Sequence, residues 1–292
     1  MQVLVLGGTG TVGSKVVAGL AAEDLDVRVG TRSPERARNL PAGATAVMAD
    51  LLKPETLSAA VQGVDAVFLL TALSQSEADE GTNVIRAMKQ AGVRRVVFLG
   101  IHNVDKAPHI PHFKTKIDIR AEIERAGLSY TILAANNFYQ NDFWYMDPIT
   151  KHGVYPQPFG SVGLNRVDVR DIADAAVNVL TGSGHEGQTY PLVGPDVLTG
   201  ETTAEIYSEA FGTPVHYGGD DLDAFAAQSK QFMPEWLVDD LRIMYDFFQK
   251  HGLRASAEDF AQQQKALGHA LRKFQDFAAE LASMAKASAT GA

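Results

Sequence analysis

The chain has 292 residues, of which 46% are hydrophobic and 21% charged, with a formal net charge of −9 and no cysteine. This balance is typical of a globular protein with one large domain, or with a core domain and a smaller one. The lack of cysteine excludes disulfides and cysteine nucleophiles, and the negative charge argues against a nucleic-acid-binding surface. No apolar run is long enough to span a membrane, and no signal peptide is recognised, so we expect a cytoplasmic protein without a membrane or nucleic-acid partner.

Short apolar runs alternate with helical patterns through the first half of the chain. The first run, residues 1–6, predicts a buried parallel strand. Further strands are predicted at residues 26–30, 45–49, 66–70, 96–99 and 130–133, with helices between them, such as residues 80–91 and 116–126. Repeated strand–helix–strand order predicts an α/β protein with a Rossmann-type, doubly wound parallel sheet.

The alternation loosens after Asn136. An aromatic segment follows, and later helical patterns cover residues 202–211, 221–228, 234–250 and 267–285. We therefore expect a dinucleotide-binding Rossmann domain over residues 1–150 and a smaller, mainly helical substrate or lid domain over residues 182–292. Residues 165–181 are expected to pack back onto the first domain.

A glycine-rich turn at residues 7–13 directly follows the first strand and precedes an apolar helical pattern. Strand, glycine turn and helix together predict a bound dinucleotide, whereas a structural turn in another α/β protein is the alternative. Gly7 permits the tight turn, Gly10 lets backbone approach a pyrophosphate, and Gly13 lets helix and strand pack closely. The helix N-terminus offers N–H groups to the phosphate. The predicted cofactor contacts of this turn are Gly7, Thr9, Gly10, Thr11, Val12 and Gly13.

Arg32 follows the second strand, where NAD-binding folds usually carry an acidic residue. A guanidinium binds a 2′-phosphate bidentately, so Arg32 with the neighbouring Ser33 favours NADP(H) over NAD(H). A solvated arginine paired with Glu35 is the alternative.

The ends of later strands supply the other expected cofactor contacts. Asp50 and Leu51 follow the third strand and are expected to meet the adenine ring, although a helix cap by Asp50 explains it equally well. The remaining predicted contacts are Thr71, Ala72 and Asn136.

With these residues, the chain resembles the NmrA-like family of atypical short-chain dehydrogenases/reductases. Besides the turn, Arg32 and Asp50-Leu51, the resemblance rests on residues 96–99, 112–116, 127–133, 137–141 and 167–173. It implies either an NAD(P)H-dependent reductase of quinones, dyes or phenylpropanoid-like compounds, or a redox-sensing regulator that binds the cofactor without turnover.

The chain departs from the superfamily at the expected catalytic positions. Ordinary members use a Ser, and a Tyr four residues before a Lys. Here the lysine place holds Lys116, the tyrosine place holds His112, and the serine region holds His102 and no serine. The resemblance implies that Lys116 binds the nicotinamide ribose. His112 and His102 are the available proton donors, with structural histidines as the alternative.

The segment after the sixth strand supplies the expected substrate contacts Asn137, Phe138 and Tyr139, which suit a flat aromatic substrate. Turn formation and core packing are the alternatives. An apolar stripe in residues 232–248 is expected to form core or a homodimer contact. No metal-ligand spacing is recognised, so no metal is expected.

A quinone or other conjugated acceptor delocalises its accepting charge, so it depends less on a proton donor than a ketone does. The missing Ser and Tyr therefore predict an NADPH-dependent reductase of a quinone or other conjugated aromatic compound, with aromatic polyketide tailoring as one setting. The alternative is a non-catalytic NADP(H)-sensing regulatory protein that binds a protein partner.

Overall fold

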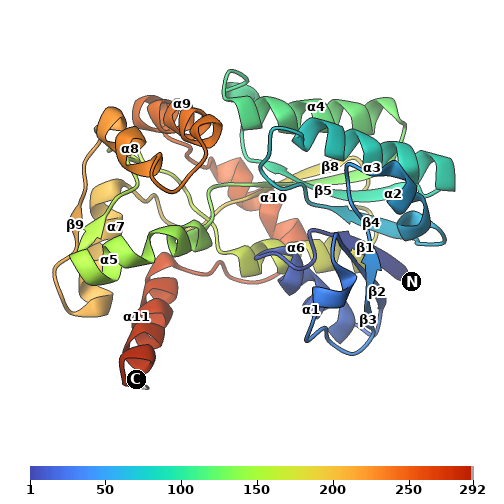
Figure 1. The fold of residues 1–292 in the computed structure, drawn as a ribbon, viewed down its shortest axis with the longest axis horizontal. Helices are drawn as coiled ribbons and strands as arrows, with labels where there is room; N and C mark the ends of the chain where they lie inside the picture. Colours follow the sequence, from blue (N-terminus) through green and yellow to red (C-terminus); the bar gives the residue numbers. More distant parts are fainter. Residues whose placement is uncertain (291–292) are drawn as a thin grey trace. The chain divides into compact units, whose positions relative to one another are not determined.

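The computed structural model describes residues 1–290, which divide into two compact units (Figure 1). The first contains residues 1–135, 169–192 and 261–269, and the second residues 136–168, 193–260 and 270 onwards. The chain therefore leaves the first unit at Ala135, returns for one helix and one strand, and returns again for the end of a later helix. The expected domains at residues 1–150 and 182–292, with residues 165–181 packing back onto the first, remain a prediction.

A parallel sheet of seven strands forms the centre of the first unit within the described residues, in the order β3-β2-β1-β4-β5-β6-β8. Its strands are β1 (Gln2–Leu6), β2 (Asp26–Thr31), β3 (Ala44–Met48), β4 (Ala66–Leu69), β5 (Arg95–Ile101), β6 (Ser129–Ala135) and β8 (Gln188–Leu192). Every neighbouring pair is parallel. The central strands are apolar without alternation because helices cover both faces of the sheet. The predicted Rossmann-type fold is confirmed.

Helices lie on both sides of the sheet (Figure 1). They are α1 (Gly13–Ala22), α2 (Pro54–Val61), α3 (Glu77–Ala91), α4 (Pro111–Arg125) and α6 (Val169–Thr181). α2, α3 and α4 pack side by side on one face, and α1 packs against α6 on the other. Gly19 lets α1 and α6 approach closely, because a Cβ at this position would lie 2.6 Å from Val177 Cγ2.

The second unit is mainly helical. Its elements are α5 (Met146–His152), α7 (Gly200–Phe211), α8 (Leu222–Ser229), α9 (Glu235–His251), α11 (Phe274–Thr290) and the short strands β7 (Val154–Tyr155) and β9 (His216–Tyr217); α10 (Ala257–Leu267) begins in this unit and ends in the first. Most of the apolar stripe of residues 232–248 is core: Met244, Tyr245, Phe247 and Phe248 are buried, whereas Phe232 is 59% exposed.

The sequence missed several elements. The helix expected over residues 267–285 begins only at Phe274, as α11, because α10 ends at Leu267 and Gly268 adopts a left-handed φ of 71°. α10 (Ala257–Leu267) was not predicted. The strands β7, β8 and β9 were not predicted. β8 sits at the sheet edge, where its first residues are exposed, so it lacks the continuous apolar run of the central strands.

A fully buried ion pair organises the second unit. Arg166 Nη2 lies 2.6 Å from Asp142 Oδ1, and neither side chain is exposed. Tyr207 donates to Asp142 Oδ2 at 2.7 Å, and Gln157 Nε2 donates to Oδ1 at 2.5 Å. Burial lowers the pKa of Arg166, but the charge of Asp142, its hydrogen bond and the neighbouring tyrosines Tyr155 and Tyr207 together raise that pKa above its usual value. Burial raises the pKa of Tyr207 well above its usual range, so it remains a neutral donor.

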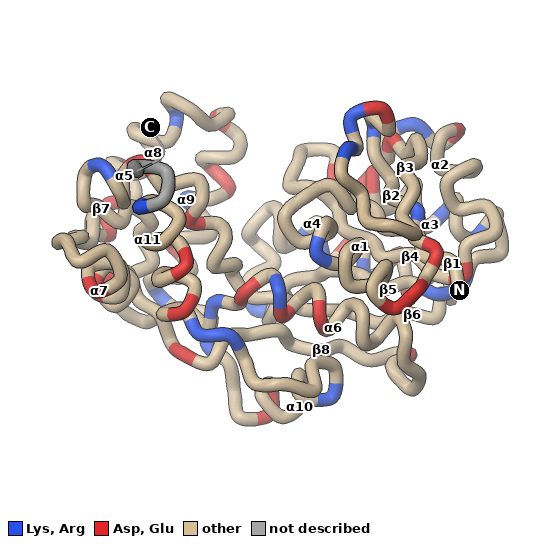
Figure 2. Tube along the Cα trace, turned by 90° about the horizontal axis from the view of Figure 1, so that it is seen from below, with Lys and Arg blue, Asp and Glu red and all other residues tan. Residues whose placement is uncertain are grey.

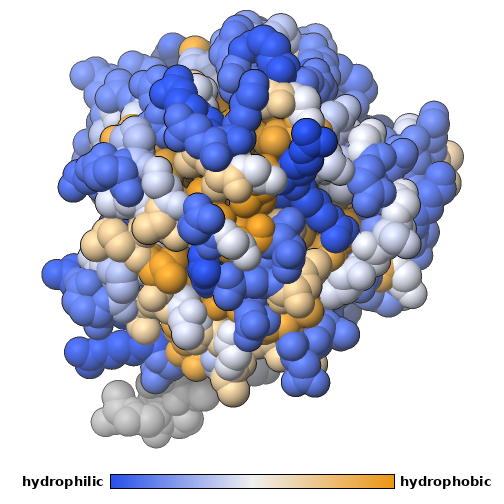
Figure 3. Space-filling model, turned by 90° about the vertical axis from the view of Figure 1, so that its right-hand side faces the viewer, coloured by the Kyte–Doolittle hydropathy of each residue, from blue (hydrophilic) through white to orange (hydrophobic). Residues whose placement is uncertain are grey.

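Charged residues are interspersed along the chain trace without a basic stripe (Figure 2). The face in Figure 3 has hydrophilic side chains over most of its periphery and apolar ones grouped towards its middle. Among the described residues, none of the helices has both the length and the apolar character needed to cross a bilayer.

Candidate active site

The glycine turn joins the carboxyl end of β1 to α1. Gly7 has a φ of 73°, which favours glycine, and a Cβ there would lie 2.4 Å from Leu70 Cδ2. A Cβ on Gly13 would lie 2.1 Å from the carbonyl oxygen of Gly7, closer than two non-bonded atoms approach. A side chain at Gly13 would displace backbone, and one at Gly7 would be strained by the left-handed φ and would displace the Leu70 side chain. The tight turn and the close packing of helix and strand therefore both depend on glycine.

Gly10 differs from the other two glycines. It is exposed, and a Cβ there would meet only the Gly7 carbonyl oxygen, at 3.3 Å. A side chain at Gly10 would therefore need only a shift of a few tenths of an ångström in the Gly7 carbonyl. A glycine at this exposed position fits a backbone that a pyrophosphate approaches closely. The following helix begins at Gly13 without a side-chain cap, which leaves N–H groups at its start for an anion.

The turn lies at the reversal point of the sheet. β1 pairs with β2 on one side and with β4 on the other, and the chain runs outwards in both directions from there. Open α/β sheets bind ligands at the carboxyl edge beside such a point. The turn, the uncapped helix start and this position fit a dinucleotide, with its pyrophosphate at the turn.

Arg32 directly follows the last residue of β2 (Asp26–Thr31), at the carboxyl edge of the sheet. Its side chain is exposed and makes no hydrogen bond or ion pair within residues 1–290. The alternative pairing with Glu35 is not present, because Glu35 contacts Arg36 instead, at 3.9 Å. Ser33 is half-buried, and its N–H donates to Thr31 Oγ1 at 3.2 Å.

Asp50 and Leu51 are held by local contacts after β3. Asp50 Oδ1 accepts from Leu52 N at 3.2 Å, and its Oδ2 lies 3.5 Å from Lys53 Nζ. Asn83 Nδ2 donates to the Leu51 carbonyl at 3.0 Å. Asp50 therefore stabilises a local turn and does not cap α2 (Pro54–Val61), whose N-cap is Lys53 without a side-chain cap bond. The adenine contact of Asp50 remains a prediction.

Lys116 lies in a buried polar cluster with Thr71 and Glu77. Its Nζ lies 2.7 Å from Glu77 Oε1 and donates to Thr71 Oγ1 at 2.9 Å. Thr71 Oγ1 in turn donates to the same Glu77 oxygen at 2.6 Å. The Lys116 side chain is 13% exposed and that of Glu77 1%. The sequence predicted Lys116 and Thr71 but missed Glu77, which neutralises the ammonium.

The two predicted proton donors lie in different surroundings. His112 is half-buried on α4 and precedes Lys116 by four residues, so the two share one helix face. His102 follows β5, is 2% exposed, and its Nε2 bonds to Asn103 Nδ2 at 3.0 Å. His112 therefore has the better access to a ligand. Ala72 is exposed beside Thr71.

The expected contacts from residue 136 onwards belong to the second unit. Asn136 is buried and donates to the Leu253 carbonyl at 2.7 Å, while Asn137 Oδ1 accepts from Arg166 Nε at 3.0 Å. Tyr139 has no exposed surface and donates to the Arg272 carbonyl at 3.2 Å.

The aromatic positions support the packing alternative more than a substrate contact. The Tyr139 ring packs edge-on against Phe274, 5.0 Å between centroids. Phe138 is half-buried. A substrate reaches Tyr139 only if that packing changes, whereas Phe138 keeps accessible surface.

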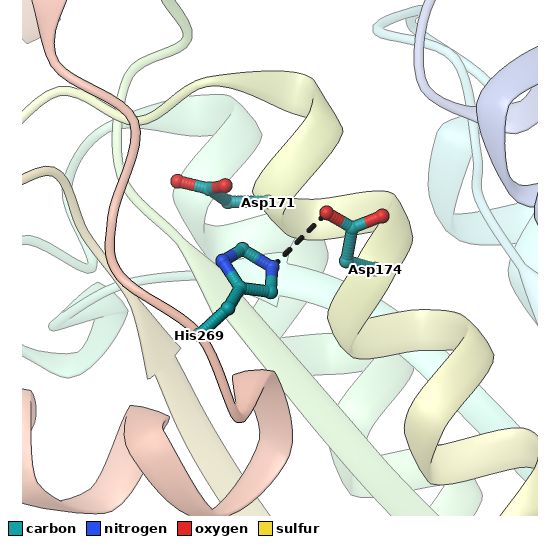
Figure 4. Close-up of side chains that lie close together, drawn as sticks. All are labelled: Asp171, Asp174 and His269. Atoms are coloured by element: carbon teal, nitrogen blue, oxygen red, sulfur yellow. Dashed lines mark hydrogen bonds and ion pairs between the residues drawn. The ribbon is translucent and has the colours of Figure 1, made fainter.

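Three potential metal ligands lie close together on α6 and after α10 (Figure 4). One ligand atom from each of Asp171, Asp174 and His269 lies within 4.8 Å of the others. His269 Nε2 already lies 3.1 Å from Asp174 Oδ2, so the cluster joins the end of α10 to α6 through a polar contact. We infer no metal site from this cluster.

Two known reductases are similar to this chain along most of its length. The chain is 36% identical to the NAD(P)H azoreductase of Xenophilus azovorans over 247 residues, 84% of this chain and 86% of that protein. It is 33% identical to (4-alkanoyl-5-oxo-2,5-dihydrofuran-3-yl)methyl phosphate reductase of Streptomyces griseus subsp. griseus, over 96% of this chain and 97% of that protein.

A solved structure shares the fold over nearly the whole length. The Escherichia coli NADPH-dependent quinone oxidoreductase in complex with NADPH superposes with a TM-score of 0.86 and 26% identity, over 96% of this chain and 99% of that one. Residues 1–278 match the NmrA-like family. The chain therefore belongs to the NmrA-like family of atypical short-chain dehydrogenases/reductases, as its glycine turn, Arg32 and the residues around Lys116 predicted.

Proposed function

We propose that this protein is an NADPH-dependent oxidoreductase that transfers hydride to a quinone or other conjugated aromatic compound. The observation that carries the proposal is the buried cluster of Lys116, Thr71 and Glu77. The cluster lies close to the cofactor turn, because Thr71 directly follows Leu70, whose side chain packs on Gly7. Reductase relatives that cover most of the chain support the same reaction class.

The preference for NADPH rests on Arg32. Its guanidinium is exposed and has no partner within residues 1–290, at the strand end where an adenosine 2′-phosphate would be read. A charged bidentate contact with phosphate gives both affinity and selectivity.

Replacing Arg32 by alanine should weaken NADPH binding by roughly 1.5–3 kcal/mol, the contribution of a hydrogen bond to a charged group. NADH binding should hardly change, since it has no 2′-phosphate. Fluorescence titration of both cofactors measures the difference, with Arg36→Ala as a control for a neighbouring exposed arginine. Equal loss for both cofactors would show that Arg32 does not read the phosphate.

A reduced nicotinamide supplies the hydride, and the residues of this chain govern orientation and charge. Lys116 is held rigidly by two bonds and presents its ammonium beside the ring of Phe98, with its Nζ 5.5 Å from the ring centroid. Because Glu77 neutralises that charge, Lys116 suits positioning of ribose hydroxyls more than strong stabilisation of an alkoxide. His112 is the accessible group that can donate a proton.

A conjugated acceptor fits this limited set of donors. Reduction of a quinone adds one hydride and one proton, and water can deliver the proton to the delocalised anion afterwards. The name of the Streptomyces relative describes a ring double bond conjugated with a carbonyl, which is the same electronic type of acceptor. Tailoring of aromatic polyketides is one setting that offers such quinones, and we include it in the proposal.

Steady-state oxidation of NADPH tests the reaction. Menadione-like and polycyclic quinones should be reduced and simple aliphatic ketones should not, because the Tyr and Ser donors are missing. Lys116→Ala should lower turnover by mispositioning the ribose, and His112→Phe should matter less. Fast ketone reduction that disappears in His112→Phe would instead make His112 the acid and refute the argument from missing donors.

A non-catalytic NADP(H)-sensing regulator that binds a protein partner is the second candidate. One observation favours it: His112 and His102 stand where ordinary members of the superfamily carry the catalytic Tyr and Ser. This candidate predicts tight NADPH binding with no oxidation by any quinone.

A further inference from the structure

Glu77 occupies a position where a helix normally carries an apolar residue. The buried residues of α3 include Glu77, Gly81, Val84 and Met88, at the spacing of one helix face. Glu77 is 1% exposed, while the other acidic residues of the first turn are more accessible. Burying a carboxylate is costly unless it is paired and hydrogen-bonded, so this position calls for a specific set of donors.

The packing of α3 against α4 brings one donor, the ammonium of Lys116, to Glu77. Each helix follows a strand of the parallel sheet, so the two run in the same direction. A Cβ on Gly81 would lie 2.6 Å from Ile119 Cγ1, so α3 and α4 approach closely there. Glu77 and Lys116 each lie about one turn earlier, and this close approach lets the carboxylate reach the ammonium at 2.7 Å.

The two carboxylate oxygens of Glu77 are used differently. Oε1 accepts from Thr71 and contacts Lys116 Nζ. Oε2 is buried and has no hydrogen-bond partner among residues 1–290. A buried carboxylate oxygen without a donor is strongly unfavourable. One half of this carboxylate is therefore satisfied by the protein, and the other half is an acceptor for a group that binds.

The position of the cluster limits what that group is. Thr71 directly follows Leu70, whose side chain packs on Gly7 of the cofactor turn. Arg32 and Asp50 lie on the β2–β3 side of that turn, and Thr71, Glu77 and Lys116 lie on the β4–β5 side. With the pyrophosphate at the turn, the adenosine half extends towards Arg32 and the nicotinamide half towards Glu77.

We propose that Glu77 Oε2 accepts a hydrogen bond from a hydroxyl of the nicotinamide ribose, while Oε1 fixes Lys116 beside the same ribose. The inference rests on the proposed NADPH cofactor. Carboxylates of dinucleotide folds accept hydrogen bonds from hydroxyls of the adenosine ribose, and the nicotinamide ribose offers the same type of donor. Phosphate carries the same sign of charge as Glu77 and is excluded. Glu77 is thus a binding and positioning residue.

Glu77→Gln tests this without emptying the site. The glutamine amide oxygen can keep the contacts of Oε1, while an NH2 group replaces Oε2 and the charge is lost. NADPH should bind about five- to 20-fold more weakly, because a hydrogen bond to an ionised group is about twice as strong as a neutral one. The fragment 2′,5′-ADP, which lacks the nicotinamide ribose, should bind as to the wild type.

Asp79→Asn is the matched control, since it removes the same charge from an exposed position in the same helix turn. It should change neither titration. A second comparison uses an NADPH analogue without the nicotinamide-ribose hydroxyls. The wild type should bind NADPH more tightly than the analogue. In Glu77→Gln the difference between the two affinities should be smaller. If Glu77→Gln does not fold, the wild-type comparison still tests the proposal.

Unchanged NADPH binding in Glu77→Gln, equal loss for NADPH and 2′,5′-ADP, or an analogue that binds the wild type as tightly as NADPH would each overturn the inference. These readouts are binding measurements. A protein that shows the expected differences but reduces no quinone would therefore refute the proposed reaction and support the role of Glu77.

Discussion

Arg166→Met is expected to lower the free energy of unfolding of the second unit by about 3–5 kcal/mol, the range for breaking one partner of a buried ion pair. The variant leaves Asp142 as a buried carboxylate without its cation, although neither side chain of the native pair is exposed. It also removes contacts with Phe159 and Phe274, whose ring centroids lie 5.1 and 5.3 Å from the guanidinium carbon. Tyr207 and Gln157 would still donate to Asp142, but neutral donors do not replace a charge.

Urea unfolding followed by near-ultraviolet circular dichroism measures this loss, because the aromatic side chains around the pair report on their packing. Lys151→Met is the matched control. It breaks the pair with Asp147, at 2.9 Å but with both side chains more than half exposed. Exposed pairs contribute little, about 0.2–1 kcal/mol. Similar small losses for both variants would contradict a stabilising role of the buried pair.

Gly10→Val is expected to abolish dinucleotide binding while the protein stays folded. A Cβ at Gly10 meets only the Gly7 carbonyl oxygen, at 3.3 Å, so a side chain there needs a small shift of that carbonyl and no rearrangement of the turn. The branched side chain would occupy the space where a pyrophosphate meets the turn and the start of α1. Losing two hydrogen bonds to a charged phosphate predicts at least about 100-fold weaker NADPH binding.

Gly13→Ala provides the contrast, because a Cβ there would lie 2.1 Å from the Gly7 carbonyl oxygen and distort the turn. The account expects lower thermal stability for Gly13→Ala and near wild-type stability for Gly10→Val. Normal NADPH affinity in a folded Gly10→Val protein would remove the cofactor from this turn.

The central fold could be predicted because its signals are local. Strands such as β4 (Ala66–Leu69) are short apolar runs buried on both faces, and the glycine turn stands directly between a strand and a helix. β8 carries no such signal because it is an edge strand with exposed first residues. Its place in the sheet depends on pairing with β6, which is distant in sequence.

The candidate site was only partly predictable for a similar reason. Family resemblance identified Lys116, but its partner Glu77 lies 39 residues earlier in the numbering and was hidden in a helix start that was placed at Glu80. Acidic residues are common in first turns, so residue type alone does not distinguish Glu77 from Asp79 and Glu80. The signal was its spacing from Gly81, Val84 and Met88, which shows that Glu77 continues the buried face.

Residues of the second unit were harder to interpret. Tyr139 was expected at the substrate, yet its ring packs against Phe274 and has no exposed surface. An aromatic segment after a strand end has the same composition whether it lines a ligand or a core. Only the tertiary packing separates these two outcomes.

Single-turnover oxidation of bound NADPH by a naphthoquinone tests the central claim most directly. The protein is loaded with one equivalent of NADPH and mixed with excess quinone, and the absorbance of the reduced nicotinamide is followed, with Lys116→Ala run in parallel. The account predicts complete oxidation by the wild type and slower oxidation by Lys116→Ala. Bound NADPH that stays reduced with every quinone, despite tight binding, would contradict the reductase and leave the NADP(H)-sensing regulator.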